Sequence, residues 1–143
     1  MSRRIYKKRE PGLEPLFRAL ADRTRLRLLN LMRDQEVCVC YFVAVLETSQ
    51  PKVSRHLAYL RRAGIVSARR QATWMHYRIA VPHDAHAARI LKEVLALIGE
   101  DREMQRDLAR LNLACCAPQK FVTLQGAPQP ARIPEASGAN AHE

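Results

Sequence analysis

Hydrophobic residues in the first half of the chain recur at helical spacing and fall into four short segments. Apolar positions over 13–20 predict an amphipathic helix, and Asp22 precedes a second helix whose buried side lies over 26–32. A third helix is expected over 41–46, after the stretch 36–40. The fourth segment, 48–64, has Val53, Leu57 and Leu60 as a narrow apolar stripe.

This fourth segment has clear helix boundaries and an unusual polar surface. Ser49 or Thr48 can cap its first amides, Pro51 is tolerated in the first turn, and Gly64 ends it. Solvated helices normally mix charge signs, yet no carboxylate occurs between residues 48 and 64. A basic, amide-rich face suits phosphates and base edges. Since a short connection joins it to the preceding helix, we interpret the helix within 48–64 as the recognition helix of a helix-turn-helix.

After Gly64 the hydrophobic period changes from helical to two. Residues 65–68 predict one strand and 74–79 a second, and residues 69–73 form a basic tip between them. A hairpin at this position is a wing, whose tip contacts phosphates or a minor groove. We expect major-groove contacts from Gln50, Ser54, Arg55 and His56, and phosphate or minor-groove contacts from Lys52, Tyr59, Arg69, Arg70 and Gln71.

The second half of the chain predicts a dimer. Residues 87–98 are more apolar than one helix on a small domain requires, and the pattern continues toward Leu111. We expect this helix to pack with the first helix in a homodimer, through Leu13, Leu16, Phe17, Leu20, Leu91, Val94, Leu95 and Ile98. The predicted fold is mainly α with a small β-hairpin. A basic arm (1–12), a winged helix-turn-helix domain (13–112) and a disordered tail (113–143) make up the chain.

Charge and cysteine content narrow the function. A net charge of +10 and a pI near 10.1 indicate a polyanionic partner, either nucleic acid or an anionic membrane surface. No apolar run is long enough to span a bilayer, and the first residues lack the apolar core of a signal peptide. We therefore expect a cytoplasmic protein with free thiols and no membrane partner. The sequence has no Cys-x-x-Cys, phosphate loop or nucleotide fingerprint, which argues against an enzyme.

Three motifs in order carry a resemblance to a known family. They are Glu-Val-Cys-Val-Cys at 36–40, Ser-Gln-Pro-Lys-Val-Ser-Arg-His-Leu at 49–57 and Trp-Met-His-Tyr-Arg at 74–78. The chain resembles the ArsR/SmtB family of metal-responsive winged-helix repressors over roughly residues 13–100. The resemblance implies a homodimer that binds its own double-stranded operator and leaves it on binding arsenite or antimonite. As(III) or Sb(III) is then the inducer, without an organic cofactor.

Cys38 and Cys40 are the candidate inducer ligands. Side chains two residues apart diverge in a regular strand and lie about 200° apart around a regular helix. They converge only where the backbone turns, as at a helix start, which is where the pattern places them. A helix N-terminus also lowers a thiol pKa and so favours the thiolate that binds soft metals. The alternative is that both are small buried core residues.

The sequence departs from the family motif at Val43, where the family has a third cysteine. Arsenite prefers three thiolates, and the adjacent Cys115 and Cys116 could supply one from the same chain or from the partner subunit. Otherwise Cys115 and Cys116 form a second metal site or belong to an inert tail. A further alternative is that the inducer needs only two thiols, as a methylated arsenical would.

Other ligands and roles stay open from the sequence. The same fold serves thiol redox sensors and repressors that respond to Cd, Pb or Zn, and a metal scavenger without regulatory function is a further alternative. Zinc sensors of the family carry ligands along the last helix. Asp84, His86 and Glu100 match part of that set, but Leu97 occupies the second histidine position. We therefore interpret Asp84 and His86 as helix-start residues.

Overall fold

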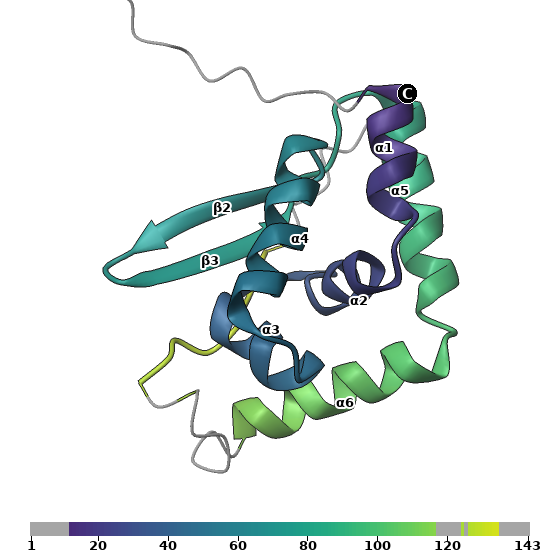
Figure 1. Cartoon of the computed structure of the whole chain (residues 1–143). Helices are drawn as coiled ribbons and strands as arrows, with labels where there is room; N and C mark the ends of the chain where they lie inside the picture. The colour runs from purple at the N-terminus through teal and green to yellow at the C-terminus, as the bar shows by residue number, and fades with distance from the viewer. Residues whose placement is uncertain (1–11, 117–123, 125, 135–143) are drawn as a thin grey trace, which may run out of the picture.

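The computed structural model describes residues 12–116, 124 and 126–134. Its elements, in chain order, are α1 (Leu13–Leu20), α2 (Arg23–Leu31), β1 (Gln35–Cys38), α3 (Val39–Leu46), α4 (Gln50–Arg62), β2 (Val66–Gln71), β3 (Trp74–Ile79), α5 (Ala85–Ile98), α6 (Arg102–Cys116) and β4 (Ala131–Arg132). Figure 1 shows the β2–β3 hairpin projecting from the helices. This arrangement confirms the predicted winged helix-turn-helix.

Helices α2, α3 and α4 form the helix-turn-helix unit. Asp22 caps α2 as predicted, because its Oδ1 accepts from the Arg25 backbone N–H at 2.9 Å. The predicted stripe of α4 is fully buried, together with the apolar residues of α2 and α3 that face it, namely Leu28, Leu29, Phe42, Val53, Leu57 and Leu60. Gly64 follows α4 with a φ of 83°, a left-handed conformation that favours glycine. The Ser49 side chain makes no capping hydrogen bond.

The sheet contains more than the predicted hairpin. Its strand order is β2-β3-β1-β4, with every neighbouring pair antiparallel. Strand β1 lies between β3 and β4, with Cys38 opposite His76 and Glu36 opposite Ala131. The hydrophobic pattern predicts no strand before the third helix, and this helix begins at Val39 instead of residue 41. Four residues are too few to show a period of two.

The wing hairpin is longer than predicted. Strand β2 runs through Gln71, so Arg69, Arg70 and Gln71 are strand residues and not part of the turn. The turn itself is short, and Ala72 adopts a left-handed φ of 52° there. Cross-strand pairing with residues 74–76 extends β2, because each added pair contributes ladder hydrogen bonds.

The expected continuous last helix is two helices. Helix α5 ends before Gly99, and Asp101 starts α6 by accepting from the backbone N–H groups of Glu103 and Met104 at 3.0 and 3.2 Å. The chain turns sharply between them, and α6 then runs along α2 and α3 (Figure 1). An Arg27–Asp107 ion pair of 2.8 Å and a buried hydrogen bond from Asn30 to the Met104 carbonyl fix α6 to α2.

The predicted disordered tail is wrong over its described part. Helix α6 includes Cys115 and Cys116, Leu124 is buried, and β4 pairs with β1. The remaining tail and residues 1–11 of the predicted arm lie outside the described residues. Within the described part of the chain, no helix is both long and apolar enough to cross a membrane.

Candidate thiol site and nucleic-acid interface

The two sulfur atoms of the Cys-Val-Cys motif face each other. Cys38 ends β1 and is the N-cap residue of α3, and Cys40 lies in the first turn of that helix. The change from strand to helix rotates the two side chains together, and the Cys40 thiol donates to the Cys38 sulfur at 3.2 Å. Cys38 is fully buried and Cys40 is half-buried. The predicted convergence at a turning backbone is therefore present.

The surroundings of Cys38 and Cys40 favour a single negative charge on the two thiols. Donation from the Cys40 thiol lowers the pKa of Cys38 to about 7, and the backbone amides of Cys40 and Val39 act in the same direction against burial. The pKa of Cys40 is raised, first because its proton is donated to Cys38 and then by burial. One proton is thus shared between two sulfur atoms, and the resulting thiolate is a soft-metal ligand near neutral pH.

We predict that Cys40→Ala raises the pKa of Cys38 from about 7 toward the value of a free thiol, about 8.5. The variant removes the main donor and keeps the burial. A pH titration of thiolate absorbance measures the change, with Cys116→Ser as the control because Cys116 is exposed. An unaltered first pKa in Cys40→Ala would show that the pair does not share a proton.

Cys115 lies on α6, a helix that packs against α3, the helix that carries Cys40. Cys115 is half-buried, whereas Cys116 is exposed. The Tyr41 hydroxyl is buried, has no hydrogen-bond partner among the described residues, and its pKa is raised to about 12 by burial and by Cys115, Cys40 and Cys38. Tyr41, which sequence reasoning missed, therefore lies within electrostatic reach of three thiols.

The described residues do not form a complete metal cluster. No group of three His, Cys, Asp or Glu side chains among residues 12–116, 124 and 126–134 is close enough to hold an ion. The partial zinc set is not assembled either. Asp84 caps α5 by accepting from the Ala87 N–H at 2.9 Å, and His86 Nδ1 lies 2.7 Å from Arg89. This agrees with the helix-start interpretation.

The exposed face of α4 is basic and projects away from the core. Gln50, Lys52 and Arg55 are exposed and Ser54 is half-buried, as expected of residues that contact DNA. His56 instead faces the start of α2, where its Nδ1 lies 3.7 Å from Asp22 and 3.5 Å from Arg25. The pKa of His56 is lowered, chiefly by burial. Its side chain is thus held within the protein and is a poor candidate for a base contact.

Two other expected contact residues are also engaged within the chain. The Arg25 guanidinium stacks over the Tyr59 ring, 4.1 Å from its centroid. Arg69 donates to the Glu36 carboxylate at 2.8 Å. Arg70 and Gln71 are exposed on the wing with Lys52 and Arg55 on α4. The basic interface therefore consists of fewer side chains than the sequence indicated.

The expected dimerisation residues divide into buried and exposed sets. Leu16, Leu91 and Ile98 are buried within the single chain, and Leu20, Val94 and Leu95 are half-buried. Leu13 and Phe17 on α1 are 68% and 50% exposed. Leu97, absent from the predicted set, is 69% exposed and lines one α5 face with Ile90 and Val94. Its spacing from Ile90 and Val94 was the available sequence signal.

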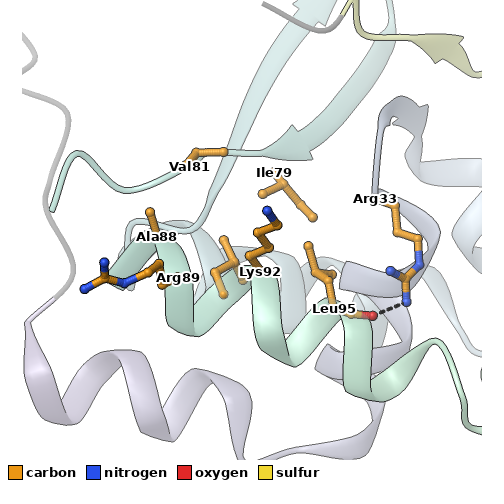
Figure 2. Close-up of a pocket in the computed structure, with 8 residues that line it drawn as sticks. Arg33, Ile79, Val81, Ala88, Arg89, Lys92 and Leu95 are labelled. Carbon is orange, nitrogen blue, oxygen red and sulfur yellow. Dashed lines mark hydrogen bonds between the residues drawn. The ribbon is translucent and has the colours of Figure 1, made fainter. Parts of the chain in front are cut away.

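A second face of α5 borders a cleft of about 330 Å³ (Figure 2). Apolar side chains and three cations line it, namely Ile79, Val81, Ala88, Leu91, Leu95, Arg33, Arg89 and Lys92. At one end Arg33 donates to the Leu95 carbonyl and so fixes the end of α2 to α5. The lining includes no thiol or carboxylate, so the cleft is unsuited to a soft metal ion.

Comparison with known proteins identifies the family. The model of the bacterial regulatory protein arsR family matches residues 22–68. The arsenical resistance operon repressor of Escherichia coli K12 is 43% identical over 99 residues, covering 68% of this chain and 85% of the repressor. The chain belongs to the arsR family. Like other arsR-family proteins it is a DNA-binding transcription regulator and not an enzyme.

Further relatives agree with this assignment. The arsenic resistance transcriptional regulator ArsR1 of Pseudomonas putida is 52% identical over 65 residues, 45% of this arsR-family chain and 51% of that protein. HlyU from Vibrio cholerae superimposes with a TM-score of 0.53 at 30% identity, covering 61% of this chain and 91% of HlyU. The homodimeric winged helix-turn-helix DNA-binding domain Mb0332 from Mycobacterium bovis has a TM-score of 0.51 at 29% identity, with 62% and 80% coverage.

Proposed function

We propose that this protein is an arsenite- or antimonite-responsive repressor that binds its operator as a homodimer. The observation that carries the proposal is the facing pair of sulfur atoms, 3.2 Å apart, at the start of α3. Helix α3 is eight residues long and leads through three residues into α4. A change at the thiols is therefore one short helix away from the element that reads DNA.

The release mechanism follows from this placement. Two sulfur atoms bound to one ion must adopt the separation and angles that the ion imposes, which distorts the first turn of α3 and shifts α4. The inducer then binds the DNA-incompetent form more tightly, and by linkage DNA weakens inducer binding equally. A coupling of about 3 kcal/mol reduces operator affinity roughly 150-fold, which is enough for derepression.

Cys115 is our proposed third thiolate, in place of the family cysteine that Val43 replaces. Cys115 is half-buried on α6 and raises the pKa of Tyr41 on α3, whereas Cys116 is exposed. Arsenic X-ray absorption counts the sulfur neighbours of the bound ion. We expect three in the wild type and in Cys116→Ser, and two in Cys115→Ser. Three sulfur neighbours in Cys115→Ser would contradict this assignment, and two in the wild type would favour a methylated arsenical as inducer.

A redox sensor of the same fold is the second candidate, because the short sulfur separation and the lowered pKa of Cys38 also favour disulfide formation. The two functions are separated by adding arsenite, antimonite, cadmium or peroxide to the complex with an operator duplex selected in vitro. We expect release by arsenite or antimonite, with mass spectrometry showing the metalloid adduct. Release by peroxide alone, with a loss of two hydrogen atoms, would contradict the metalloid proposal.

For DNA reading, we predict different effects of two arginine substitutions. Arg55→Ala on α4 should cost about 1–3 kcal/mol on the operator and relax sequence preference, since it removes a base-edge contact. Arg70→Ala on the wing should weaken operator and random DNA alike and reduce the salt slope by about one. Titrations at several salt concentrations measure both effects. Equal losses on operator and random DNA for Arg55→Ala would contradict this division.

A further inference from the structure

The carboxylate of Glu36 joins strand β1 to the wing. Its Oε1 accepts from Arg69 Nε at 2.8 Å and lies 4.0 Å from His76 Nδ1. The Glu36 and His76 side chains are 12% and 5% exposed, whereas that of Arg69 is 51% exposed. The carboxylate end of the pair is thus nearly buried, whereas the guanidinium end is open to solvent and screened by it.

The strand register connects the same pair to the thiol site. Cys38 of β1 lies opposite His76 of β3, and His76 lies opposite Arg69 of β2. Residues directly opposite one another point to the same face of a sheet, so these three form one row across three strands. Glu36, two residues before Cys38, is on that face too. Cys38 and Arg69 are therefore both direct cross-strand neighbours of His76.

The row also contains a buried nitrogen atom, Nε2 of the His76 ring, that lacks a hydrogen-bond partner among the described residues. An unsatisfied buried nitrogen costs free energy, so an arrangement that gives it a partner is favoured by that amount. The observed arrangement of the row is therefore kept in place by its other contacts, which include the Glu36–Arg69 ion pair between β1 and β2.

We propose that the Glu36–Arg69 pair is a positioning element that holds the wing for DNA binding and is weakened when Cys38 and Cys40 capture a metalloid. This inference rests on the proposed function and adds a second route to the shift of α4. Strand β2 carries Arg70 and Gln71 just beyond Arg69, so loosening the pair moves both away from the DNA. Arg69 then acts through wing geometry and not as a phosphate contact.

The test is a double-mutant cycle on operator affinity with and without arsenite. The variants are Glu36→Gln, Arg69→Gln and the double substitution, with Arg23→Gln as the matched control because Arg23 of α2 forms a 2.8 Å ion pair with Asp101. In wild type the ratio of the two affinities is the coupling. We expect this ratio of operator affinities to fall about tenfold in each single variant and no further in the double variant. In Arg23→Gln the ratio should stay unchanged.

Salt dependence separates positioning from direct contact. Arg69→Gln should keep the wild-type salt slope, unlike Arg70→Ala. An unchanged coupling in Glu36→Gln and Arg69→Gln, or a salt slope reduced by about one in Arg69→Gln, would overturn the inference. If arsenite fails to release even the wild type, the proposed function fails and this inference with it. If the wild type responds and Glu36→Gln responds equally, this inference alone is wrong.

Discussion

Replacing Asp107 with Ala should lower the free energy of unfolding by about 2–3 kcal/mol, between the cost of breaking an exposed and a buried ion pair. The Asp107 side chain is 6% exposed and accepts from Arg27 Nε and Nη2 at 2.8 and 2.9 Å. Removing the carboxylate leaves a guanidinium that is 20% exposed without its bidentate partner. Urea denaturation followed by circular dichroism measures the change.

The control for this prediction is Arg23→Ala, which breaks exposed ion pairs with Asp101 and Glu103 on the same two helices. We expect a much smaller loss there, because solvent already screens those pairs. A loss in Asp107→Ala no larger than in Arg23→Ala would mean that α6 is not held by the Arg27 pair. The result bears on function, since α6 carries Cys115 against α3.

Replacing Leu97 with Glu should convert the protein to a monomer and reduce operator affinity about 100-fold or more. The exposed Leu97 side chain lies on one α5 face with Ile90 and Val94, and a carboxylate there would be buried without a partner in a dimer. Loss of the second subunit removes the avidity of two half-sites. Analytical ultracentrifugation gives the mass, and operator titrations give the affinity.

Leu113→Glu is the matched control, because Leu113 is 50% exposed on α6, outside the expected interface. It should remain a dimer with wild-type operator affinity. A dimeric Leu97→Glu protein, or a monomeric Leu113→Glu protein, would place the interface elsewhere than on α1 and α5.

Much of the fold could be predicted because helices of eight or more residues repeat their apolar positions several times. The α4 stripe of Val53, Leu57 and Leu60 is an example, and all three are fully buried. Strands β1 and β4 were missed because four and two residues show no period. The break between α5 and α6 was missed because apolar spacing continues through Gly99, and the local cap at Asp101 decided the boundary.

The site could be predicted where local backbone geometry determines it. The convergence of Cys38 and Cys40 follows from two residues at a helix start. The roles of His56, Tyr59 and Arg69 could not be predicted, since their partners Asp22, Arg25 and Glu36 lie more than thirty residues away in the chain. A basic side chain looks available in sequence until a distant acid or aromatic ring is found beside it.

The most direct test of the account is the coupling between arsenite and operator in Cys38→Ser/Cys40→Ser. Fluorescence anisotropy of a labelled operator duplex gives the affinity with and without arsenite. We expect a loss of roughly 150-fold in the wild type. In the double variant we expect no loss, with the arsenite-free affinity unchanged. Release of the double variant by arsenite at the wild-type concentration would contradict the claim that these two sulfur atoms control DNA binding.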